Sequence, residues 1–181
     1  MHPGSPFYTI GHSTRSVAEL TDLLREAGAD LVVDVRTIPR SRTNPQFNAD
    51  ALPAALAPYQ IGYRHCRRLG GLRGRQKDQG PSRNTFWENA SFRNYADYAA
   101  TPDFREGMTA LLELGGSQVC AIMCAEAVWW RCHRRIITDY LLAGGREVFH
   151  IMGPGKIERA SMNSAAVLES DGTLVYMGSH P

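Results

Sequence analysis

The sequence predicts an α/β protein with a largely parallel sheet flanked by helices and a C-terminal β-hairpin. The unbroken apolar run Val119–Cys124 is typical of a strand that is buried in a parallel sheet. Segments with helical apolar spacing alternate with short β-prone runs along most of the chain, as in α/β proteins. Near the end, Asp171-Gly172 separates two short apolar runs, which is a typical hairpin turn. Because there is no repeat and no linker, residues 1–181 are expected to form one domain.

The remaining strands are expected at short runs that favour β structure. Leu31–Arg36 is the clearest of them, and its alternation places Asp34 and Arg36 on one face. Further strands are expected at 7–10, 61–66 and 147–152, and the hairpin strands at 165–169 and 173–176. In α/β proteins the carboxyl ends of such strands form the edge where ligands bind.

Capping residues mark where the helices are expected. Ser16 and Glu19 fit a capping box at the start of a helix that stops at Gly28. The segment Thr101–Asp103 supplies an N-cap, a proline at the first position and an acid in the first turn of a helix ending at Leu114. Asn48 is expected to cap a helix over 49–57, Ser91 to cap a short helix carrying Tyr95 and Tyr98, and another helix to cover 136–143.

Charge is unevenly distributed along the chain. The net charge is +2, yet nine basic residues and only one acid, Asp50, lie between Arg36 and Lys77. Part of this segment is a basic, glycine-rich loop at about 67–84. A local positive field favours an anionic partner, such as a phosphate, a nucleotide or a nucleic acid. The alternative is a solvated, arginine-rich loop with no partner.

The sequence also restricts where the protein works. No apolar run approaches the ~20 residues that a membrane span needs, and the N-terminus lacks the pattern of a signal peptide. We therefore expect a cytoplasmic protein that does not enter a membrane. The four cysteines form no CxxC pair, so in a reducing compartment they are expected to be free thiols or ligands rather than disulfides. The sequence predicts neither a cofactor nor an oligomeric state.

The stretch Cys124–Arg134 concentrates reactive side chains at one strand-to-helix junction. Glu126 follows the buried strand, while Cys132 and His133 fall where the next helix is expected to begin. A cysteine in the first turn of a helix, next to an imidazole and several guanidinium groups, has the surroundings that lower a thiol pKa.

Three interpretations of this junction remain open. In the first, Cys132 is a nucleophile and His133 or Glu126 moves protons. In the second, Cys124, Cys132 and His133 or His12 hold a metal such as zinc, with Glu126 or Asp34 nearby. This interpretation is less favoured, because adjacent residues rarely bind one ion and no CxxC or HxxxH spacing occurs. In the third, the cysteines are structural, and Asp34 and Glu126 perform the acid–base work.

Several residues near the strand ends are candidates for binding an anion. Asp34 either forms an internal salt bridge or is held beside the site, and Arg36, Arg40 and Arg42 could clamp a phosphate. The short loop after the first strand could direct backbone N–H groups at an anion. The candidate catalytic residues are Asp34, Glu126, Cys132 and His133, the candidate substrate-binding residues are His12, Ser13, Arg36, Arg42, Asn48 and Arg134, and no residue is assigned to a metal.

The short motifs of the chain form a combination that is specific, although each alone is weak. They are Tyr8-Thr-Ile-Gly-His-Ser13, Asp34-Val-Arg36, Pro39-x-Ser-Arg42, Pro45-x-Phe-Asn48, Leu69-Gly-Gly71, Cys124-Ala-Glu126 and Cys132-His-Arg134. Together they resemble the bacterial Domain of Unknown Function 488 family, from Tyr8 to the C-terminal hairpin. The resemblance implies a small cytoplasmic α/β domain whose motif residues gather at strand ends, and it implies no particular reaction.

Taken together, these features favour an enzyme that acts on a phosphate-bearing substrate, a nucleotide or a nucleic acid, by hydrolysis or group transfer. Asp34 and Glu126 would then be acid and base, with Cys132 and His133 as nucleophile, proton carrier or supports. Arg36, Arg42 and Arg134 would clamp the anion. Two other classes remain open: a non-catalytic nucleic-acid-binding module that uses residues 36–77, and a thiol-based redox or metal protein.

Overall fold

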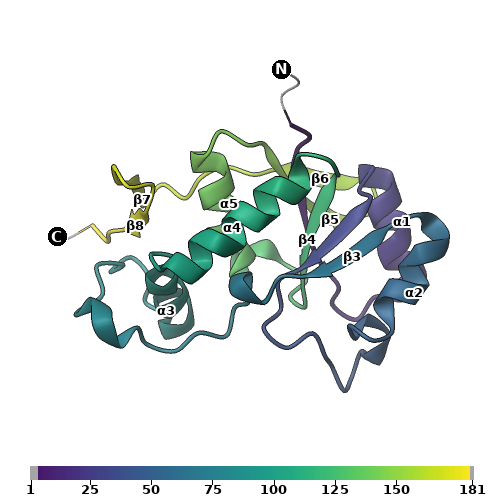
Figure 1. The fold of residues 1–181 in the computed structure, drawn as a ribbon, viewed down its shortest axis with the longest axis horizontal. Helices are drawn as coiled ribbons and strands as arrows, with labels where there is room; N and C mark the ends of the chain where they lie inside the picture. The colour runs from purple at the N-terminus through teal and green to yellow at the C-terminus, as the bar shows by residue number, and fades with distance from the viewer. Residues whose placement is uncertain (1–3, 180–181) are drawn as a thin grey trace.

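The computed structural model describes residues 4–179, which build a six-stranded sheet, five helices and a small separate hairpin (Figure 1). The strand order is β3-β2-β4-β1-β5-β6. Neighbours pair in parallel except β5 and β6, which are antiparallel. The strands are β1 (Phe7–Gly11), β2 (Leu31–Asp34), β3 (Gly62–His65), β4 (Cys120–Cys124), β5 (Val148–Gly153) and β6 (Lys156–Arg159). The predicted α/β fold with a largely parallel sheet is therefore confirmed.

The helices cover the two faces of this sheet unequally. They are α1 (Val17–Ala27), α2 (Leu52–Leu56), α3 (Ala90–Tyr98), α4 (Pro102–Gly115) and α5 (Arg134–Ala143). Leucines of α1 and α2 pack on one face, and apolar residues of α3, α4 and α5 pack on the other (Figure 1). Single 3-10 turns lie at Pro45–Phe47, Ala57–Tyr59, Arg67–Leu69, Lys77–Gln79 and Trp129–Arg131.

Alternation along the central strands explains this two-sided core. In β4, Ile122 packs toward α3, α4 and α5, while its neighbours Ala121 and Met123 pack toward α1 and α2. In β2, Val33 and Val32 divide in the same way. These side chains are fully buried, which is why both strands read as nearly continuous apolar runs.

Pairing places three strand ends side by side at the site. Gly11, the last residue of β1, pairs with Cys124, the last residue of β4. Asp34, the last residue of β2, pairs with Met123. The chain leaves β1 and β2 toward the α1–α2 face but leaves β4 toward the opposite face. The strand ends therefore diverge and open a crevice, as expected where a doubly wound sheet reverses direction.

Two helix starts and one helix end follow the predicted signals. Ser16 and Glu19 form the capping box of α1, and Gly28 ends this helix with a left-handed φ of 72°. Thr101 caps α4 by accepting from the backbone N–H of Phe104.

Three predictions about helix starts were wrong. Asn48 does not cap α2, which begins at Leu52, because its side-chain oxygen instead accepts from the backbone N–H of Ser41. Ser91 does not cap α3, since Asn89 fills that role. Cys132 is not in the first turn of α5, because the helix begins at Arg134 and a 3-10 turn precedes it. Cys132 is therefore held by a loop rather than by a helix.

The predicted C-terminal hairpin is confirmed, and it is separate from the six-stranded sheet. Its strands β7 (Ala166–Leu168) and β8 (Leu174–Tyr176) form a sheet of their own at the side of α3 (Figure 1). The phenol of Tyr176 donates to the carboxylate of Asp139 in α5, which ties β8 to that helix. The edge strand β6 was not predicted. Among residues 4–179, no helix combines the length and the apolar character that crossing a membrane demands.

Candidate functional site

A cavity of about 550 Å³ opens where the carboxyl ends of β1, β2 and β4 meet. Most of its walls are loops that follow the strands, and the end of β4 and the first turn of α3 complete them. The lining residues are His12, Arg36, Thr37, Ile38, Arg40, Ser41, Gly71, Leu72, Asn89, Ser91, Phe92, Cys124, Ala125, Glu126, Arg131, Cys132 and His133. The cavity therefore unites motif segments that lie far apart in the sequence.

Two thiols lie against each other in the cavity wall. The sulfur of Cys124 is 2.6 Å from the sulfur of Cys132, and both side chains are buried except where they meet the cavity. The backbone N–H and the Nε of Arg134 each donate to the Cys132 sulfur at 3.4 Å. The Nδ1 of His133 lies 3.5 Å from the same sulfur. The sulfur of Cys132 thus faces a thiol, a guanidinium, an imidazole and a backbone N–H group.

These neighbours divide the two thiols into an anion and a neutral acid. Burial by itself raises the pKa of Cys132, but the hydrogen bond from Cys124 and the positive charges of His133 and Arg134 outweigh burial and hold that pKa well below its usual range. Burial raises the pKa of Cys124, and the adjacent Cys132 thiolate raises it further. These surroundings favour the thiolate form at Cys132 and the thiol form at Cys124.

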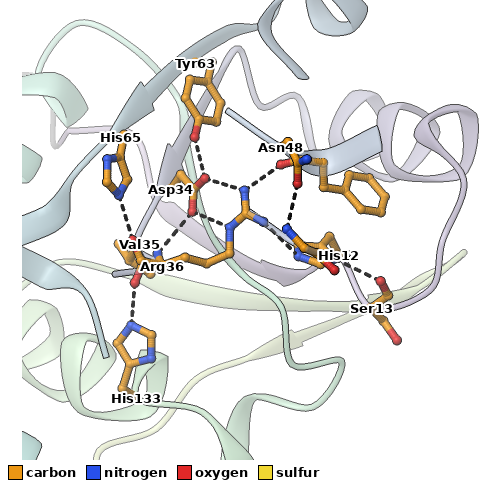
Figure 2. Close-up of polar contacts among 11 residues, drawn as sticks. His12, Ser13, Asp34, Val35, Arg36, Asn48, Tyr63, His65 and His133 are labelled. Carbon is orange, nitrogen blue, oxygen red and sulfur yellow. Dashed lines mark hydrogen bonds and ion pairs between the residues drawn. The ribbon is translucent and has the colours of Figure 1, made fainter. Parts of the chain in front are cut away.

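His133 is oriented by the end of β2 and by a glycine. Its Nε2 donates to the carbonyl oxygen of Val35 at 2.8 Å (Figure 2), which turns Nδ1 toward the sulfur of Cys132. A Cβ atom at Gly71 would lie within 3.0 Å of this ring, so only glycine leaves room for it. The pair Cys132–His133 thus has the geometry of a nucleophile and its base, even though the residues are adjacent in sequence.

Arg134 is locked in place by contacts that involve no carboxylate. Its side chain is 1% exposed and donates to the carbonyl oxygen of Glu126 at 2.7 Å and to the hydroxyl of Thr9 at 3.2 Å. Gly11 allows this loop to approach, because a Cβ atom there would overlap the Glu126 carbonyl. Among the contacts of this guanidinium, the sulfur of Cys132 is the group that carries negative charge.

Asp34 and Arg36 form a closed ion pair at the end of β2 (Figure 2). The carboxylate accepts from the Nε and NH2 groups of Arg36 at 2.9 and 2.7 Å, and the phenol of Tyr63 also donates to it. Asp34 is fully buried and does not line the cavity. The carboxylate, together with the carbonyl oxygen of Phe47, fixes the guanidinium at the cavity wall. This geometry is the internal salt bridge that the sequence left as one of two alternatives.

His12 lies between this ion pair and the thiols. Its Nδ1 donates to the carbonyl oxygen of Ser13 at 2.9 Å, and its Nε2 faces the NH1 group of Arg36 at 3.3 Å. The ring also stacks on Phe47, with 4.5 Å between centroids. Burial lowers the pKa of His12, and the charge of Arg36 lowers it further, although the bond to Ser13 works in the opposite direction. His12 is thus a neutral spacer with both ring nitrogens occupied.

Exposed charged side chains lie at the mouth of the cavity. Arg40, Arg131 and Glu126 are exposed and line the opening. Arg40 lies 3.8 Å from Asp50, but both side chains are at least 70% exposed, so this pair holds Arg40 only weakly. The exposed side chains of Ile38 and Leu72 add an apolar edge. The opening therefore offers two guanidinium groups, one carboxylate and an apolar rim.

The structure brings half of the predicted site residues to the cavity surface. His12, Arg36, Glu126, Cys132 and His133 line it. Asp34 and Arg134 lie behind the surface and hold Arg36 and Cys132 in place. Ser13, Arg42 and Asn48 are not among the lining residues. Ser13 makes a left-handed turn with a φ of 48°, Arg42 is exposed, and Asn48 anchors the loop at Ser41.

Some residues of the site were missed or only partly understood from the sequence. Cys124 was considered only as a metal ligand or a structural thiol, because the contact with Cys132 depends on how the loop folds back. Arg131 was noted only as a charge beside Cys132, and the need for glycine at position 71 was not foreseen. Within residues 4–179, no three His, Cys, Asp or Glu side chains are grouped so as to hold a metal ion.

The fold and the cavity define a class: a doubly wound α/β protein with a cavity, lined in part by two cysteines, where the sheet reverses direction. The chain belongs to the family described as domain of unknown function DUF488, whose model matches residues 16–141. This match confirms the family that the motifs suggested. No curated protein matches the chain, and no solved structure matches it.

Proposed function

We propose that the protein is a thiol-dependent enzyme in which Cys132 is the nucleophile for hydrolysis or group transfer on a small, phosphate-bearing substrate. The observation that carries this proposal is the set of donors around the Cys132 sulfur: the guanidinium and N–H of Arg134, the imidazole of His133 and the thiol of Cys124. Such a set stabilises an anion on sulfur, and the thiolate is the reactive form of cysteine. The proposal places the protein in the cytoplasm, where thiols stay reduced.

In this proposal each residue of the junction has a separate task. Cys132 attacks the substrate, and His133, oriented by Val35, takes or returns a proton at Nδ1. Glu126 is an exposed carboxylate at the cavity mouth, so it serves proton transfer to a water or a leaving group. Asp34 becomes a positioning residue rather than an acid, because Arg36 and Tyr63 already occupy its oxygens.

The charges at the mouth support an anionic substrate. Arg40 and Arg131 line the cavity with exposed guanidinium groups, and Arg36 adds a third that is partly neutralised by Asp34. Guanidinium forks match the oxygens of a phosphate. The apolar rim formed by Ile38 and Leu72 suits a substrate that also carries an apolar or planar part. Arg40 and Arg131 therefore replace Arg42 in the anion clamp that the sequence suggested.

The rate of cysteine alkylation as a function of pH tests the nucleophile. Iodoacetamide should modify Cys132 with an apparent pKa well below the ~8.5 of a free thiol. The site of modification is read by peptide mass mapping, and Cys66, a half-buried thiol outside the cavity, serves as the internal control. His133→Ala should shift the profile of Cys132 upward while leaving that of Cys66 unchanged. A Cys132 that alkylates no faster than Cys66 at neutral pH would refute the proposal.

Substitution of Glu126 then tests the enzymatic part. Once a phosphorylated substrate has been found by screening, Glu126→Gln should abolish turnover and leave substrate binding intact, because the amide keeps the shape but cannot transfer a proton. Arg131→Ala should instead weaken binding. Unchanged turnover in Glu126→Gln would show that this residue takes no part in the reaction, which would then be assigned to Cys132 and His133 alone.

A second candidate function, nucleic-acid binding, is supported by a different surface. Arg64 and Arg67 on β3 and the turn after it are exposed, as are Arg75 and Lys77 in the following loop. Within residues 4–179, none of these four forms a salt bridge. Binding of a fluorescent oligonucleotide that weakens steeply with salt would support this function. Absence of binding at low salt would leave the cavity as the sole anion site.

A further inference from the structure

We propose that Cys124 and Cys132 together reduce a hydroperoxide and cycle between a dithiol and a disulfide. This inference adds an activity and a means of control to the site proposed above, and it rests on Cys132 being the reactive thiol of that site. The disulfide would remove the nucleophile and so turn the site off until a reductant restores it.

The positions of the two sulfurs carry the inference. They lie 2.6 Å apart, and the Cys124 sulfur is the nearest thiol to the site where Cys132 would be oxidised. Cys124 ends β4, which is held on both sides by β1 and β2, whereas Cys132 lies in the loop before α5. The loop can therefore adjust to the geometry of a disulfide while the strand stays fixed.

Access through the cavity directs an oxidant to Cys124 and Cys132 rather than to the other cysteines. Both cysteines are at least 96% buried, yet both line the cavity, so a small oxidant reaches them from the mouth. Cys66 and Cys120 do not line it. Among residues 4–179, the sulfur-to-sulfur contact between Cys124 and Cys132 is the only one observed. Oxidation should therefore yield this disulfide and no other.

The chemistry balances with a hydroperoxide as oxidant. The Cys132 thiolate attacks the terminal peroxide oxygen and the O–O bond breaks. The departing alkoxide takes a proton from His133 or from water and leaves as an alcohol. Cys132 becomes a sulfenic acid. The Cys124 thiol then attacks the Cys132 sulfur and the S–O bond breaks, and the proton lost by Cys124 leaves with the hydroxide as water. Two thiols and one hydroperoxide thus give one disulfide, one alcohol and one water.

The division of labour between the two thiols follows from their surroundings. Arg134 and His133 contact Cys132, so the sulfur that attacks the peroxide is the one stabilised as an anion. The nitrogen atoms of Arg134 and His133 lie 3.4 to 3.5 Å from the sulfur of Cys132, whereas the thiol of Cys124 donates to the backbone oxygen of Glu126 at 3.8 Å. Cys124 is therefore suited to attack second, as the resolving thiol.

Hydrogen peroxide and dithiothreitol test the inference on the full chain. The background is Cys66→Ser/Cys120→Ala, which retains only the pair. After one equivalent of peroxide and alkylation of the remaining thiols, intact mass should show the loss of two hydrogen atoms and no alkylation, and peptide mapping should link residues 124 and 132. Dithiothreitol should reverse the change and support repeated peroxide consumption. Cys124→Ser should instead oxidise further at Cys132, gain two oxygen atoms and stop after one turnover.

Each outcome has a definite meaning. A Cys124–Cys132 disulfide with repeated turnover, lost in Cys124→Ser, supports the inference. The inference is overturned if the two thiols stay reduced, or if Cys132 passes directly to sulfinic acid while Cys124 is present. This outcome is measured with both cysteines in place, so it does not depend on whether Cys124→Ser folds. If no disulfide forms but Cys132 still alkylates at low pH, the proposed nucleophile survives and only the redox activity fails. If the disulfide forms while Cys132 alkylates as an ordinary thiol, the proposal that Cys132 is an activated nucleophile is refuted instead.

Discussion

Arg36 and Arg134 are both buried arginines beside the same cavity, but they are neutralised in different ways. Arg36 is 7% exposed and pairs with Asp34, whose two oxygens accept three of its N–H groups, counting the backbone N–H. Arg134 is 1% exposed and faces two backbone or hydroxyl oxygens and the sulfur of Cys132. A carboxylate is ionised at any neutral pH, whereas a thiol is not unless its surroundings favour the anion.

This difference shows what each arginine does for the site. Arg36 and Asp34 form a finished pair that fixes the ends of β2 and the loop after it. Arg134 contacts no carboxylate, and its charge lowers the pKa of Cys132 while the thiols raise the pKa of Arg134. The pair of Arg36 with Asp34 supports the structure, whereas the contact of Arg134 with Cys132 favours the reactive form of the thiol.

The largest expected effect on stability comes from removing the carboxylate that pairs with Arg36. Asp34→Asn would leave the buried guanidinium of Arg36 without its counter-ion, which should lower the free energy of unfolding by about 3–5 kcal/mol. Urea unfolding measures the change. A loss below about 1 kcal/mol would mean that water or another acceptor replaces the carboxylate, and the contrast between the two arginines would weaken.

The next effect follows from a histidine on the Arg134 side. Burial, and then the charge of Arg134, lowers the pKa of His150 to about 4. Because the unfolded chain binds this proton near pH 6.5, stability should be full above that pH and fall as the pH drops toward about 4, by up to ~3 kcal/mol. His12, near Arg36, acts in the same direction with a smaller shift. In urea unfolding from about pH 7 to about pH 4, His150→Gln should flatten the pH dependence more than His12→Gln. Equal slopes in the two variants would contradict this assignment.

A glycine substitution should separate reactivity from stability. In Gly71→Ala the new Cβ would meet the ring of His133, which must move away from Cys132. We expect slower alkylation of Cys132 at neutral pH and a loss of about 1–3 kcal/mol from the free energy of unfolding. Gly74→Ala is the matched control, because nothing lies within 4 Å of a Cβ there and its φ is not positive. Equal alkylation rates in the two variants would show that His133 does not act on Cys132.

The smallest effect is expected at the exposed pair. Arg40 and Asp50 are both largely exposed and 3.8 Å apart, so Asp50→Asn should change the free energy of unfolding by less than about 0.5 kcal/mol. The same variant should bind a phosphorylated ligand at least as well, because Arg40 would be freer to reach it. A loss as large as that of Asp34→Asn would erase the distinction between buried and exposed pairs.

The sequence was sufficient for the parts of the fold that depend on local patterns. The apolar run of β4 and the capping box of α1 are written in neighbouring residues, and both appear where expected. Strand β6 was missed because three of its four side chains, at Lys156, Glu158 and Arg159, are polar. It is an edge strand that pairs only with β5. Its presence depends on the tertiary position of a short turn, not on its composition.

The candidate site was predictable in location but not in its internal contacts. Motif residues at the ends of β1, β2 and β4 were expected to gather, and parallel pairing does bring these ends together. The contact of Cys124 with Cys132 depends on a loop of irregular conformation, and no periodicity encodes it. Likewise, the alternation of β2 places Asp34 and Arg36 on one face, but alternation does not determine that the two side chains pair with each other instead of facing a ligand.

The position of β1 in the sheet has a consequence for how the chain folds during synthesis. This first strand lies between β4 and β5, which begin at Cys120 and Val148. While the ribosome is still producing the first two-thirds of the chain, β1 has neither of its neighbours, and β2 can pair only with β3. Long-range pairing of this kind closes slowly and late. The sheet is therefore completed from its centre, once β4 and then β5 have been synthesised.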